Sequence, residues 1–298
     1  MPRPHIWMLH GPTASGKTAL AIALAKHVGA RILNTDARQL YREMRIGVAR
    51  PNEEELSSVY HHGIASHSIH DAVTAMSYAQ WASPWMETEL AERGQVVLVG
   101  GSGLYAKALL YHSDPFPEAD PEFRKTMELR WKEDAEALVD ELRSKDPDYA
   151  AQADVKNSRR VIRALEVIAL TGKTYSSQRT TDTHPRPRFD AEYHEFALWP
   201  GMPALESRIA KRTAAMFREG LREEAQGLAA YADLPALQTV GYREFFEEPN
   251  ADATSLKALI STHTRQYAKR QLTWIQKQPG VERIPLGSGP EVLLSCLP

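Results

Sequence analysis

Short apolar runs alternate with longer amphipathic stretches along most of this chain. The short runs predict buried strands at Ile6–Leu9, Ile32–Asn34, Val96–Val99, Glu195–Trp199 and Val281–Pro285. The longer stretches predict helices over Thr18–Val28, Tyr78–Arg93, Pro121–Arg143, Ser158–Leu170, Leu205–Ala230 and Ser255–Lys277. Because strands and helices alternate, we expect an α/β protein with a parallel sheet that is covered by helices on both faces.

One stretch breaks this alternation. From about residue 112 to residue 154 the pattern is helical and interrupted by prolines, and it contains no run typical of a strand. We therefore predict an inserted helical lobe over residues 113–155. It would lie between a first part of the core at residues 1–112 and a second part at residues 156–298. A polar segment with two prolines predicts a loop over residues 180–188.

Composition narrows the class of protein. The chain has 298 residues, 43% of them hydrophobic, which is enough to bury a substantial core. A single cysteine, Cys296, excludes an internal disulfide and a thiolate metal cluster. No apolar run approaches the roughly 18 residues of a membrane span, and the first run is too short for a signal peptide. We therefore expect a cytoplasmic protein with no membrane partner.

The charge is unevenly distributed along the chain. The net charge of −2 argues against a surface that is basic throughout. Residues 118–148 carry eleven acids and six bases, a pattern typical of solvated helix faces. Residues 156–173 instead carry five bases and one acid, and three arginines of this run fall within one turn of a predicted helix. That turn is a candidate patch for binding nucleic acid.

The first motif with a chemical meaning is a phosphate-binding loop. Gly11–Thr18 reads GPTASGKT, lies between a predicted strand and a predicted helix, and fits the pattern G-x-x-x-x-G-K-[ST]. The pattern predicts a P-loop NTPase-like core that binds a di- or triphosphate, without selecting ATP. Lys17 would neutralise the terminal phosphates, and the Thr18 hydroxyl is the candidate ligand for a Mg²⁺ cofactor. The predicted diphosphate-binding residues are Gly11, Thr13, Ala14, Ser15, Gly16, Lys17 and Thr18.

A missing acid narrows the reaction. ATPases of this class usually carry an acidic residue at the end of a second strand, but Val96–Val99 is followed by two glycines. The acid instead follows the neighbouring run, as Asp36. Since ligands bind beyond the carboxyl ends of parallel strands, we expect Asp36 to face the phosphate loop. It is a candidate general base, and a helix N-cap or a water-mediated Mg²⁺ ligand is the alternative.

Motifs in a characteristic order give the chain a resemblance to the tRNA dimethylallyltransferase family. They are Gly11–Thr18, Asp36–Tyr41, Ile46–Pro51, Gly100–Tyr105, Asn157–Glu166, Val240–Glu244 and Thr264–Trp274. That family transfers the prenyl group of dimethylallyl diphosphate to the exocyclic amine of an adenosine beside the anticodon. The resemblance implies dimethylallyl diphosphate and the anticodon loop of tRNA as partners, and we expect a monomer.

The resemblance also implies roles for single residues. Asp36 would be the catalytic base, and Thr13, Lys17 and Arg212 would act on the departing diphosphate. The implied tRNA contacts are Asp36, Ala37, Arg38, Gln39, Ser102, Arg124, Arg159, Arg160 and Arg163. The chain departs from the family pattern at Ala37, Val48, Arg50 and Ala65. Of these, Ala37 and Val48 remove hydroxyl groups near the expected crevice.

Other interpretations stay open at this stage. Arg208 and Arg212 also fit a solvated pair on a helix, and the spacing of Tyr267 and Trp274 favours a core stripe over base stacking. His61, His62, His67 and His70 complete no recognised metal-ligand spacing, so we assign them no role. A small-molecule kinase, an isopentenyltransferase acting on free adenine nucleotides, and a non-catalytic RNA-binding module are the alternative functions.

Overall fold

The computed structural model of the chain describes residues 3–114, 116–179 and 186–297. The chain divides into two compact units. The core unit combines the residues up to Tyr111 with those from Pro187 onward, and the helical unit spans His112–Arg186. Of the loop predicted over residues 180–188, residues 180–185 lie outside the described residues.

A parallel sheet forms the centre of the core unit. Its strands are β1 (His5–His10), β2 (Arg31–Asn34), β3 (His61–His62), β4 (Gln95–Val99), β5 (Glu192–Trp199) and β6 (Glu282–Pro285). Over the described residues these six strands pair in the order β3-β2-β4-β1-β5-β6, and every pair is parallel. β1 is buried from Ile6 to His10 because helices cover both of its faces. The predicted α/β fold is thereby confirmed.

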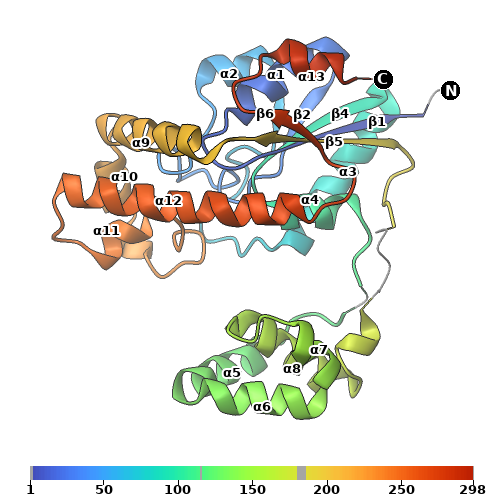
Figure 1. Cartoon of the computed structure of the whole chain (residues 1–298), viewed down its shortest axis with the longest axis vertical. Coiled ribbons are helices and arrows are strands. Elements are labelled where there is room, and N and C mark those ends of the chain that lie inside the picture. The colour runs from blue at the N-terminus through green and yellow to red at the C-terminus, as the bar shows by residue number, and fades with distance from the viewer. Residues whose placement is uncertain (1–2, 115, 180–185, 298) are drawn as a thin grey trace. The chain divides into compact units, whose positions relative to one another are not determined.

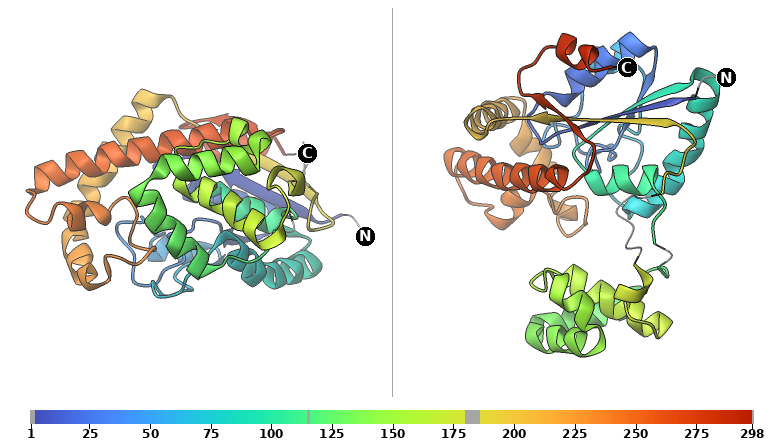
Figure 2. Two further views of the ribbon diagram at one scale, coloured as in Figure 1. Left: turned by 90° about the horizontal axis from the view of Figure 1, so that it is seen from below. Right: turned by 45° about the vertical axis from the view of Figure 1, so that its right-hand side comes forward.

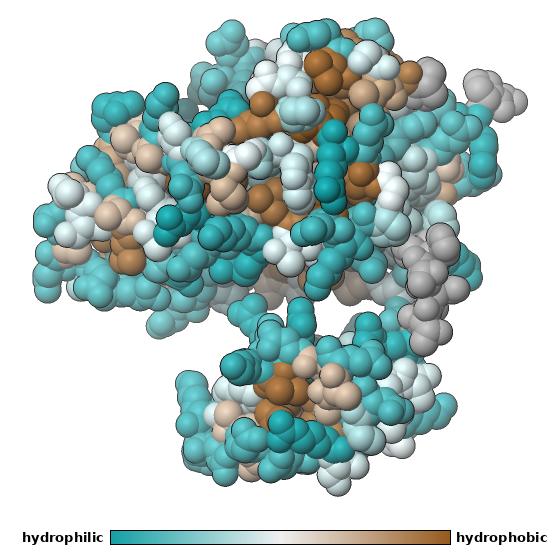
Figure 3. Space-filling model, viewed as in Figure 1, coloured by the Kyte–Doolittle hydropathy of each residue, from teal (hydrophilic) through white to brown (hydrophobic). Residues whose placement is uncertain are grey.

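Helices lie on both faces of this sheet (Figures 1 and 2). On one face α1 (Lys17–Val28) and α13 (Pro290–Ser295) pack against the strands, and α2 (Glu53–Ser58) lies beside α1. On the other face lie α3 (Ala75–Arg93) and α4 (Gly103–Leu110). Figure 3 shows apolar residues gathered where α13 lies against the core unit.

The second segment of the core unit adds further helices. They are α9 (Met202–Arg218), α10 (Leu221–Gly227), α11 (Arg243–Glu247) and α12 (Ala253–Gln276). Their buried residues form an apolar cluster that also includes Tyr41 and Met44 from the first segment. α12 lies alongside α9 and reaches the carboxyl end of β4, which places both helices at the edge of the sheet where the phosphate loop begins (Figure 1).

The helical unit has its own apolar core. It contains α5 (Pro121–Glu133), α6 (Ala135–Lys145), α7 (Pro147–Gln152) and α8 (Ser158–Thr171), and its described residues include no strand. Asp120, Asp134 and Asp146 cap the first three of these helices by accepting hydrogen bonds from backbone amides. Such N-caps start each helix at a defined residue, which explains part of the acidic character of this segment.

Several predicted elements differ from the structure. The helix expected over Pro121–Arg143 ends at Asp134, whose side chain caps the next helix instead. The helix expected over Leu205–Ala230 is interrupted at Gly220, which adopts the left-handed φ of 98°. The edge strand β3 and the short helices α2, α4, α7, α11 and α13 were not predicted, because each is too short to show a clear period.

The second boundary of the inserted lobe also differs from the prediction. We expected the lobe to end at residue 155 and α8 to belong to the core, but the helical unit continues to Arg186. The reason is packing: Val161 and Leu165 of α8 lie in one apolar cluster with Met127, Leu138 and Leu142 of α5 and α6. The basic turn at Arg159–Arg163 therefore belongs to the same unit as the acidic run.

Among the described residues, no helix combines the length and the apolar character that crossing a membrane would require.

Candidate active site at the phosphate loop

The phosphate loop links β1 to α1 in the conformation that its sequence predicts. Gly11 and Gly16 have φ values of 156° and 89°, and Ala14 between them also adopts a left-handed φ of 62°. A side chain at Gly11 would lie 3.0 Å from Ser15 Oγ and 3.2 Å from Lys17 Cγ. The loop is therefore closed around its own backbone, as a cradle for an anion requires.

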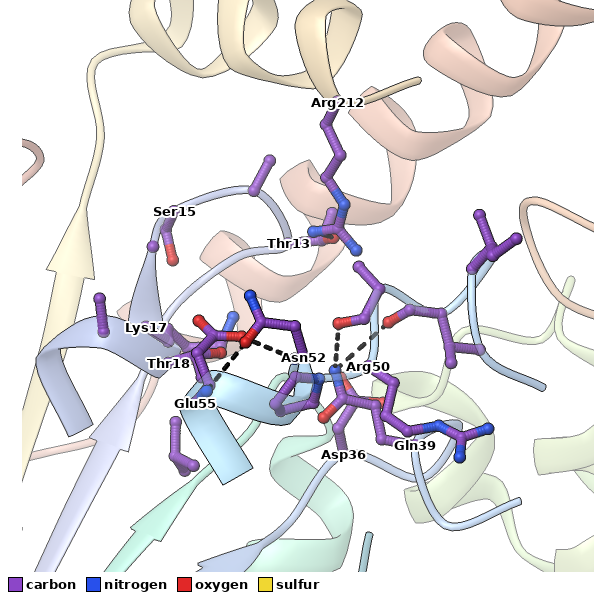
Figure 4. A pocket seen from close by; sticks show the side chains of 18 of the residues that line it. Thr13, Ser15, Lys17, Thr18, Asp36, Gln39, Arg50, Asn52, Glu55 and Arg212 are labelled. Carbon is purple, nitrogen blue, oxygen red and sulfur yellow. Dashed lines mark hydrogen bonds between the residues drawn. The ribbon is translucent and has the colours of Figure 1, made fainter. Parts of the chain in front are cut away.

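Positive charges from two elements surround this loop. Lys17 Nζ lies 2.8 Å from the Pro12 carbonyl oxygen, Arg212 Nη1 of α9 lies 3.1 Å from Thr13 Oγ1, and Arg208 Nη1 lies 3.5 Å from the Ser15 carbonyl oxygen. Figure 4 shows Arg212 reaching from its helix to Thr13. Arg212 is thus not a solvated helix residue, whereas Arg208 is exposed and also reaches the loop. They add two guanidinium groups to the phosphate loop.

The electrostatics of Lys17 reflect this crowding. Burial lowers the pKa of its ammonium group to about 8, against the opposing influence of the Asp36 carboxylate and with the help of Arg212. Ser15 Oγ is buried and has no hydrogen-bond partner among the described residues. A lysine whose pKa is lowered by burial and a buried hydroxyl without a described partner both fit a site that binds an anion.

The loop opens into a cavity of about 630 Å³. Its walls include Asp36, which follows β2, together with Thr18, Lys17 and Arg212. The structure thus brings Asp36 to the cavity of the phosphate loop, as its place after a parallel strand predicts. Asp36 Oδ1 also accepts a hydrogen bond of 3.0 Å from the Arg38 amide, so one carboxylate oxygen holds the turn that follows.

Polar groups behind Asp36 fix the same turn. The Ala37 amide donates to Ser102 Oγ at 3.0 Å, and the Asp36 amide donates to Asn34 Oδ1 at 3.0 Å. Gln39 Nε2 donates to the carbonyl oxygens of Val48 and Ala49 at 3.3 and 3.0 Å. Ser102 and Gln39, both expected as RNA contacts, are therefore also used to shape the site.

A smaller cavity of about 70 Å³ adjoins Asp36. Thr13 and Arg212 stand at its polar side, next to the phosphate loop. Its remaining wall is mixed. Apolar surface comes from Val48, Ile209, Met216, Val240 and Ile260, and polar groups come from Arg38, Thr213, Thr239, Thr264 and Tyr267. Val48, one of the departures from the family pattern, contributes a methyl surface here where the family commonly carries a hydroxyl.

Helix α12 supplies site residues whose contacts have no local signal in the sequence. Gln271 Oε1 accepts a hydrogen bond of 2.9 Å from the Thr13 amide, and its Nε2 donates to the Gly101 carbonyl oxygen at 2.8 Å. A side chain at Gly101 would lie 2.2 Å from Gln271 Nε2. The glycines after β4 therefore make room for α12. The motif Thr264–Trp274 contains Gln271, but it lies far from the phosphate loop in the sequence. The motif therefore did not indicate this contact.

The two aromatic residues of α12 have different surroundings. Trp274 packs against Gly103 and against the His10 ring, with ring centroids 5.5 Å apart, which fits the expected core role. Tyr267 instead lines the cavity beside Asp36 and hydrogen-bonds Ser102. Burial, followed by the negative charge of Asp36, raises the pKa of Tyr267 to about 12. Tyr267 thus lines a cavity, and the choice between a core role and base stacking stays a prediction.

The segment Arg45–Pro51 is held by a carboxylate. Glu224 accepts hydrogen bonds from the amides of Arg45, Ile46 and Gly47, and from the Tyr242 hydroxyl. A side chain at Gly47 would lie 2.4 Å from the Tyr242 ring, so this position requires glycine. Arg50 donates to the carbonyl oxygens of Arg42 and Met44, and its guanidinium thus helps to close the same segment.

The predicted basic turn has a different arrangement in the helical unit. Arg124 donates to both oxygens of the fully buried Glu166 at 2.8 Å, and Arg163 pairs with the same carboxylate. Burial alone would raise the pKa of Glu166, but the hydrogen bonds from these two arginines outweigh it and lower the pKa. Arg159 and Arg160 are exposed. Part of the predicted patch is thus internally neutralised.

The histidines of residues 61–70 do not gather as a metal site among the described residues. His62 stacks on Trp81 and Trp85, with centroid distances of 4.7 and 4.5 Å. We continue to assign these histidines no role.

Comparisons with known proteins agree with this geometry. The family description "IPP transferase" matches residues 39–278. The tRNA dimethylallyltransferase of Christiangramia forsetii is 38% identical over 91% of this chain and 90% of that protein. That of Cytophaga hutchinsonii is 37% identical over 93% and 91%. The solved tRNA isopentenylpyrophosphate transferase of Bacillus halodurans has a TM-score of 0.70, with 29% identity over 98% of this chain and 94% of that chain.

The phosphate loop, the aspartate across the cavity and the agreement over nearly the whole length lead to one conclusion: the chain belongs to the tRNA dimethylallyltransferase family.

Proposed function

We propose that this protein transfers the dimethylallyl group of dimethylallyl diphosphate to the exocyclic amine of the adenosine beside the anticodon of tRNA, releasing diphosphate. The observation that carries the proposal is that Asp36, Lys17 and Arg212 line the same cavity. One side of the cavity suits a leaving diphosphate and the other offers a proton acceptor. A transfer to a weakly basic amine needs both.

The phosphate loop binds the diphosphate. Backbone amides of the loop would bind its oxygens, apart from those of Thr13 and Ser15, which donate to Gln271 and to the Pro12 carbonyl oxygen. Lys17, Arg208 and Arg212 neutralise its charge. Negative charge grows on the diphosphate as the allylic C–O bond breaks. Fixed cations at that position stabilise the transition state more than the bound substrate, which is the condition for raising the rate. Thr13 contributes by its contact with Arg212.

The residues present fit a Mg²⁺ cofactor beside the diphosphate. Mg²⁺ favours oxygen ligands and commonly uses few protein groups together with phosphate oxygens. The Thr18 hydroxyl, at the second position of α1, is such a ligand, and Ser15 Oγ is a buried hydroxyl without a described partner. When bound, the ion would neutralise charge on the departing diphosphate.

Asp36 acts as the general base. Its carboxylate accepts a proton from the adenine amine as the new C–N bond forms, and the carbocation-like prenyl group is thereby captured. Oδ1 is engaged by the Arg38 amide, so Oδ2, beside Gly101, is the oxygen available for the proton. Holding the turn and accepting the proton do not conflict, because a carboxylate has two oxygens. The alternative of a water-mediated Mg²⁺ ligand stays untested.

The small cavity beside Asp36 holds the prenyl group. Its apolar residues limit the water around a group that leaves with cationic character, and Thr13 and Arg212 line it next to the diphosphate. The dimethylallyl chain would extend from the phosphate loop into this cavity, which Asp36 also lines. Val48 lacks the hydroxyl that the family commonly has at this position, so the cavity wall binds less water there. The proposed reaction is unchanged.

The acceptor adenosine leaves its stack to reach Asp36, at a cost that is lowest in a loop. The proposed contacts in the core unit are Asp36, Ala37, Arg38, Gln39 and Ser102. The first four form one turn, and Ser102 accepts a hydrogen bond from that turn. In the helical unit we propose Arg159 and Arg160 as direct phosphate contacts. Arg124 and Arg163 both pair with the single carboxylate of Glu166, so the three side chains keep one net positive charge. That net charge contributes to binding the RNA.

The enzyme acts as a cytoplasmic monomer in this proposal. Phosphate loop, base and prenyl cavity all come from one core unit, so a second copy is not needed to complete the site. Light scattering of the protein at micromolar concentration measures the mass directly. A stable dimer would contradict the monomer without affecting the proposed chemistry.

The decisive experiment supplies labelled dimethylallyl diphosphate with unmodified tRNA and, separately, with AMP. We expect label in tRNA alone. Label in AMP only would indicate a transferase for free nucleotides, and ATP consumption without prenyl transfer would indicate a kinase.

Asp36→Asn should lower kcat by about 10³–10⁴ while tRNA affinity changes by only about a few fold. The matched control is Asp190→Asn, which removes an exposed carboxylate that pairs with Arg3 among the described residues. Near-normal turnover of Asp36→Asn would exclude Asp36 as the base.

A further inference from the structure

Three potential metal ligands converge at the end of the sheet opposite the phosphate loop. His5 Nδ1 lies 3.0 Å from His194 Nε2 and 3.6 Å from Glu192 Oε2. One ligand atom from each of the three side chains lies within 4.8 Å of the other two. His5 begins β1, and the phosphate loop follows the far end of the same strand, so this cluster is separate from the site described above.

The strand register explains why these side chains meet. β1 and β5 are parallel neighbours in which His5 pairs with Glu192 and Trp7 pairs with His194. Since alternate residues of a strand share a face, all four side chains lie on one face of the sheet. Trp7 stacks on His194, with ring centroids 4.0 Å apart and an interplanar angle of 17°. It stacks also on His5, at 5.5 Å. The indole thus orients both imidazoles.

The donor set has the chemistry of a particular class of cation. Two imidazole nitrogens and one carboxylate oxygen are typical of zinc and related divalent transition metals, whereas Mg²⁺ and Ca²⁺ favour oxygen alone. Ligands at about 2.0–2.1 Å from a tetrahedral zinc ion lie about 3.3 Å from one another. The observed 3.0 and 3.6 Å bracket this separation. Glu192 is half-exposed and can adjust by the few tenths of an ångström that coordination requires.

We propose that His5, Glu192 and His194 bind a divalent transition cation of the zinc class, which joins the first strand of the sheet to β5. Without the cation, one proton lies between the two facing nitrogens as a hydrogen bond. On binding, the imidazole that carries this proton takes it at its other ring nitrogen, and the cation occupies the place between the two lone pairs. Three protein ligands leave a fourth position for water, because the cluster is partly exposed.

The test uses the untagged full chain and Co²⁺, whose visible absorption reports four- or five-coordinate binding to nitrogen and oxygen, followed by competition with Zn²⁺. Excess Mg²⁺ is present throughout to fill oxygen-rich sites. We expect one equivalent of Co²⁺ to bind and Zn²⁺ to displace it. Glu192→Gln, an exposed change that leaves the strands intact, should weaken binding about tenfold or more, and His194→Ala should abolish the absorption. The matched control is His27→Ala, which removes an exposed histidine elsewhere in the core unit.

A second readout separates binding at this cluster from adsorption at other histidines. Zn²⁺ should raise the Tm of the wild type and of His27→Ala by several degrees, and should leave the Tm of Glu192→Gln nearly unchanged. The proposal is overturned if the wild type shows no stoichiometric Co²⁺ band, or if Glu192→Gln and His194→Ala, both folded by circular dichroism, bind Co²⁺ as tightly as the control.

Discussion

Two groups of arginines and lysines in this protein have opposite arrangements. Around the phosphate loop, Lys17 and Arg212 find backbone oxygen or hydroxyl partners and point into a cavity. In the helical unit, Arg124 and Arg163 point at a buried carboxylate, Glu166, and two exposed arginines remain beside them. Local sequence identifies Lys17 through its loop motif, but it does not show what the helical arginines of either group contact. What differs is whether a carboxylate of the protein pairs directly with the cations. Glu166 does so in the helical unit, whereas Asp36 acts on Lys17 and Arg212 through its charge.

This difference separates binding from stability. A cation without an internal carboxylate gains its largest interaction when a substrate anion arrives, so its removal should affect the reaction. A cation paired with a buried carboxylate has already used that interaction in folding, so removal of the carboxylate should affect stability. The exposed arginines should affect neither strongly. Each of the following changes tests one part of this contrast.

Arg212→Ala should have the largest effect. Loss of a fixed charge at the departing diphosphate is expected to lower kcat by about 10²–10³, with little change in Tm. Single-turnover transfer from labelled dimethylallyl diphosphate to tRNA measures the rate. Arg218→Ala on the same helix is the control, because Arg218 is exposed and outside the cavity lining. Equal rates for both variants would mean that Arg212 is only a solvated helix residue.

Glu166→Gln should mainly destabilise the helical unit. It removes the charge that faces Arg124 and Arg163 and weakens an acceptor for the Asp120 amide. We expect a loss of about 2–3 kcal/mol in the free energy of unfolding, near the lower end for breaking a buried pair because both arginines reach solvent. Urea unfolding followed by circular dichroism measures it. Glu141→Gln, which breaks exposed pairs in the same unit, should cost much less. Similar losses for the two would contradict the contrast.

The pH dependence of diphosphate binding should identify Lys17. With a pKa of about 8 in the free protein, Lys17 is protonated below that pH and loses its charge as the pH rises through it. Affinity should therefore fall above pH 8, by about tenfold at one unit higher. Lys17→Arg stays protonated and gives the matched comparison, because the ligand's own titration is the same for both proteins. Parallel profiles measured by calorimetry would exclude Lys17 as the titrating group.

Arg159→Ala should have the smallest effect. One exposed phosphate contact is expected to change tRNA affinity by about a few fold at physiological salt and to reduce the slope of log K against log salt by about one. Filter binding across a salt series measures both. Arg143→Ala is the control, since Arg143 already pairs with Glu136 and Asp140. An unchanged slope would exclude Arg159 from the RNA contacts.

Much of the fold was predictable because the inner strands are buried on both faces and the longer helices carry regular apolar spacing. The strands around β1 and β4 fall where their apolar runs predict, and Asp36 reaches the cavity because it follows a parallel strand. What could not be predicted depends on contacts distant in sequence. Nothing in the local pattern at Arg159–Arg163 shows that Val161 and Leu165 pack with α5 and α6, which moves the basic turn into the helical unit.

The same limit applies to the site. The loop Gly11–Thr18 could be identified from its spacing alone, because its chemistry is local. Gln271, Tyr267 and Glu224 could not, since each acts on a segment far away in the chain, and a glutamine on a helix has no recognisable pattern. The resemblance to a family identified the motif that contains Gln271, yet only the structure assigns its two hydrogen bonds.

The link made by Gln271 has a consequence for the order in which the protein is made. Its side chain joins Thr13 and Gly101, which are 258 and 170 residues earlier in the chain. On the ribosome, β1, α1 and the phosphate loop emerge long before α12 exists. At roughly 5–20 residues per second, more than ten seconds of synthesis separate the loop from its partner. During that interval the nascent loop lacks the hydrogen bond that fixes Thr13, so the enzyme becomes competent only when one of its last helices docks.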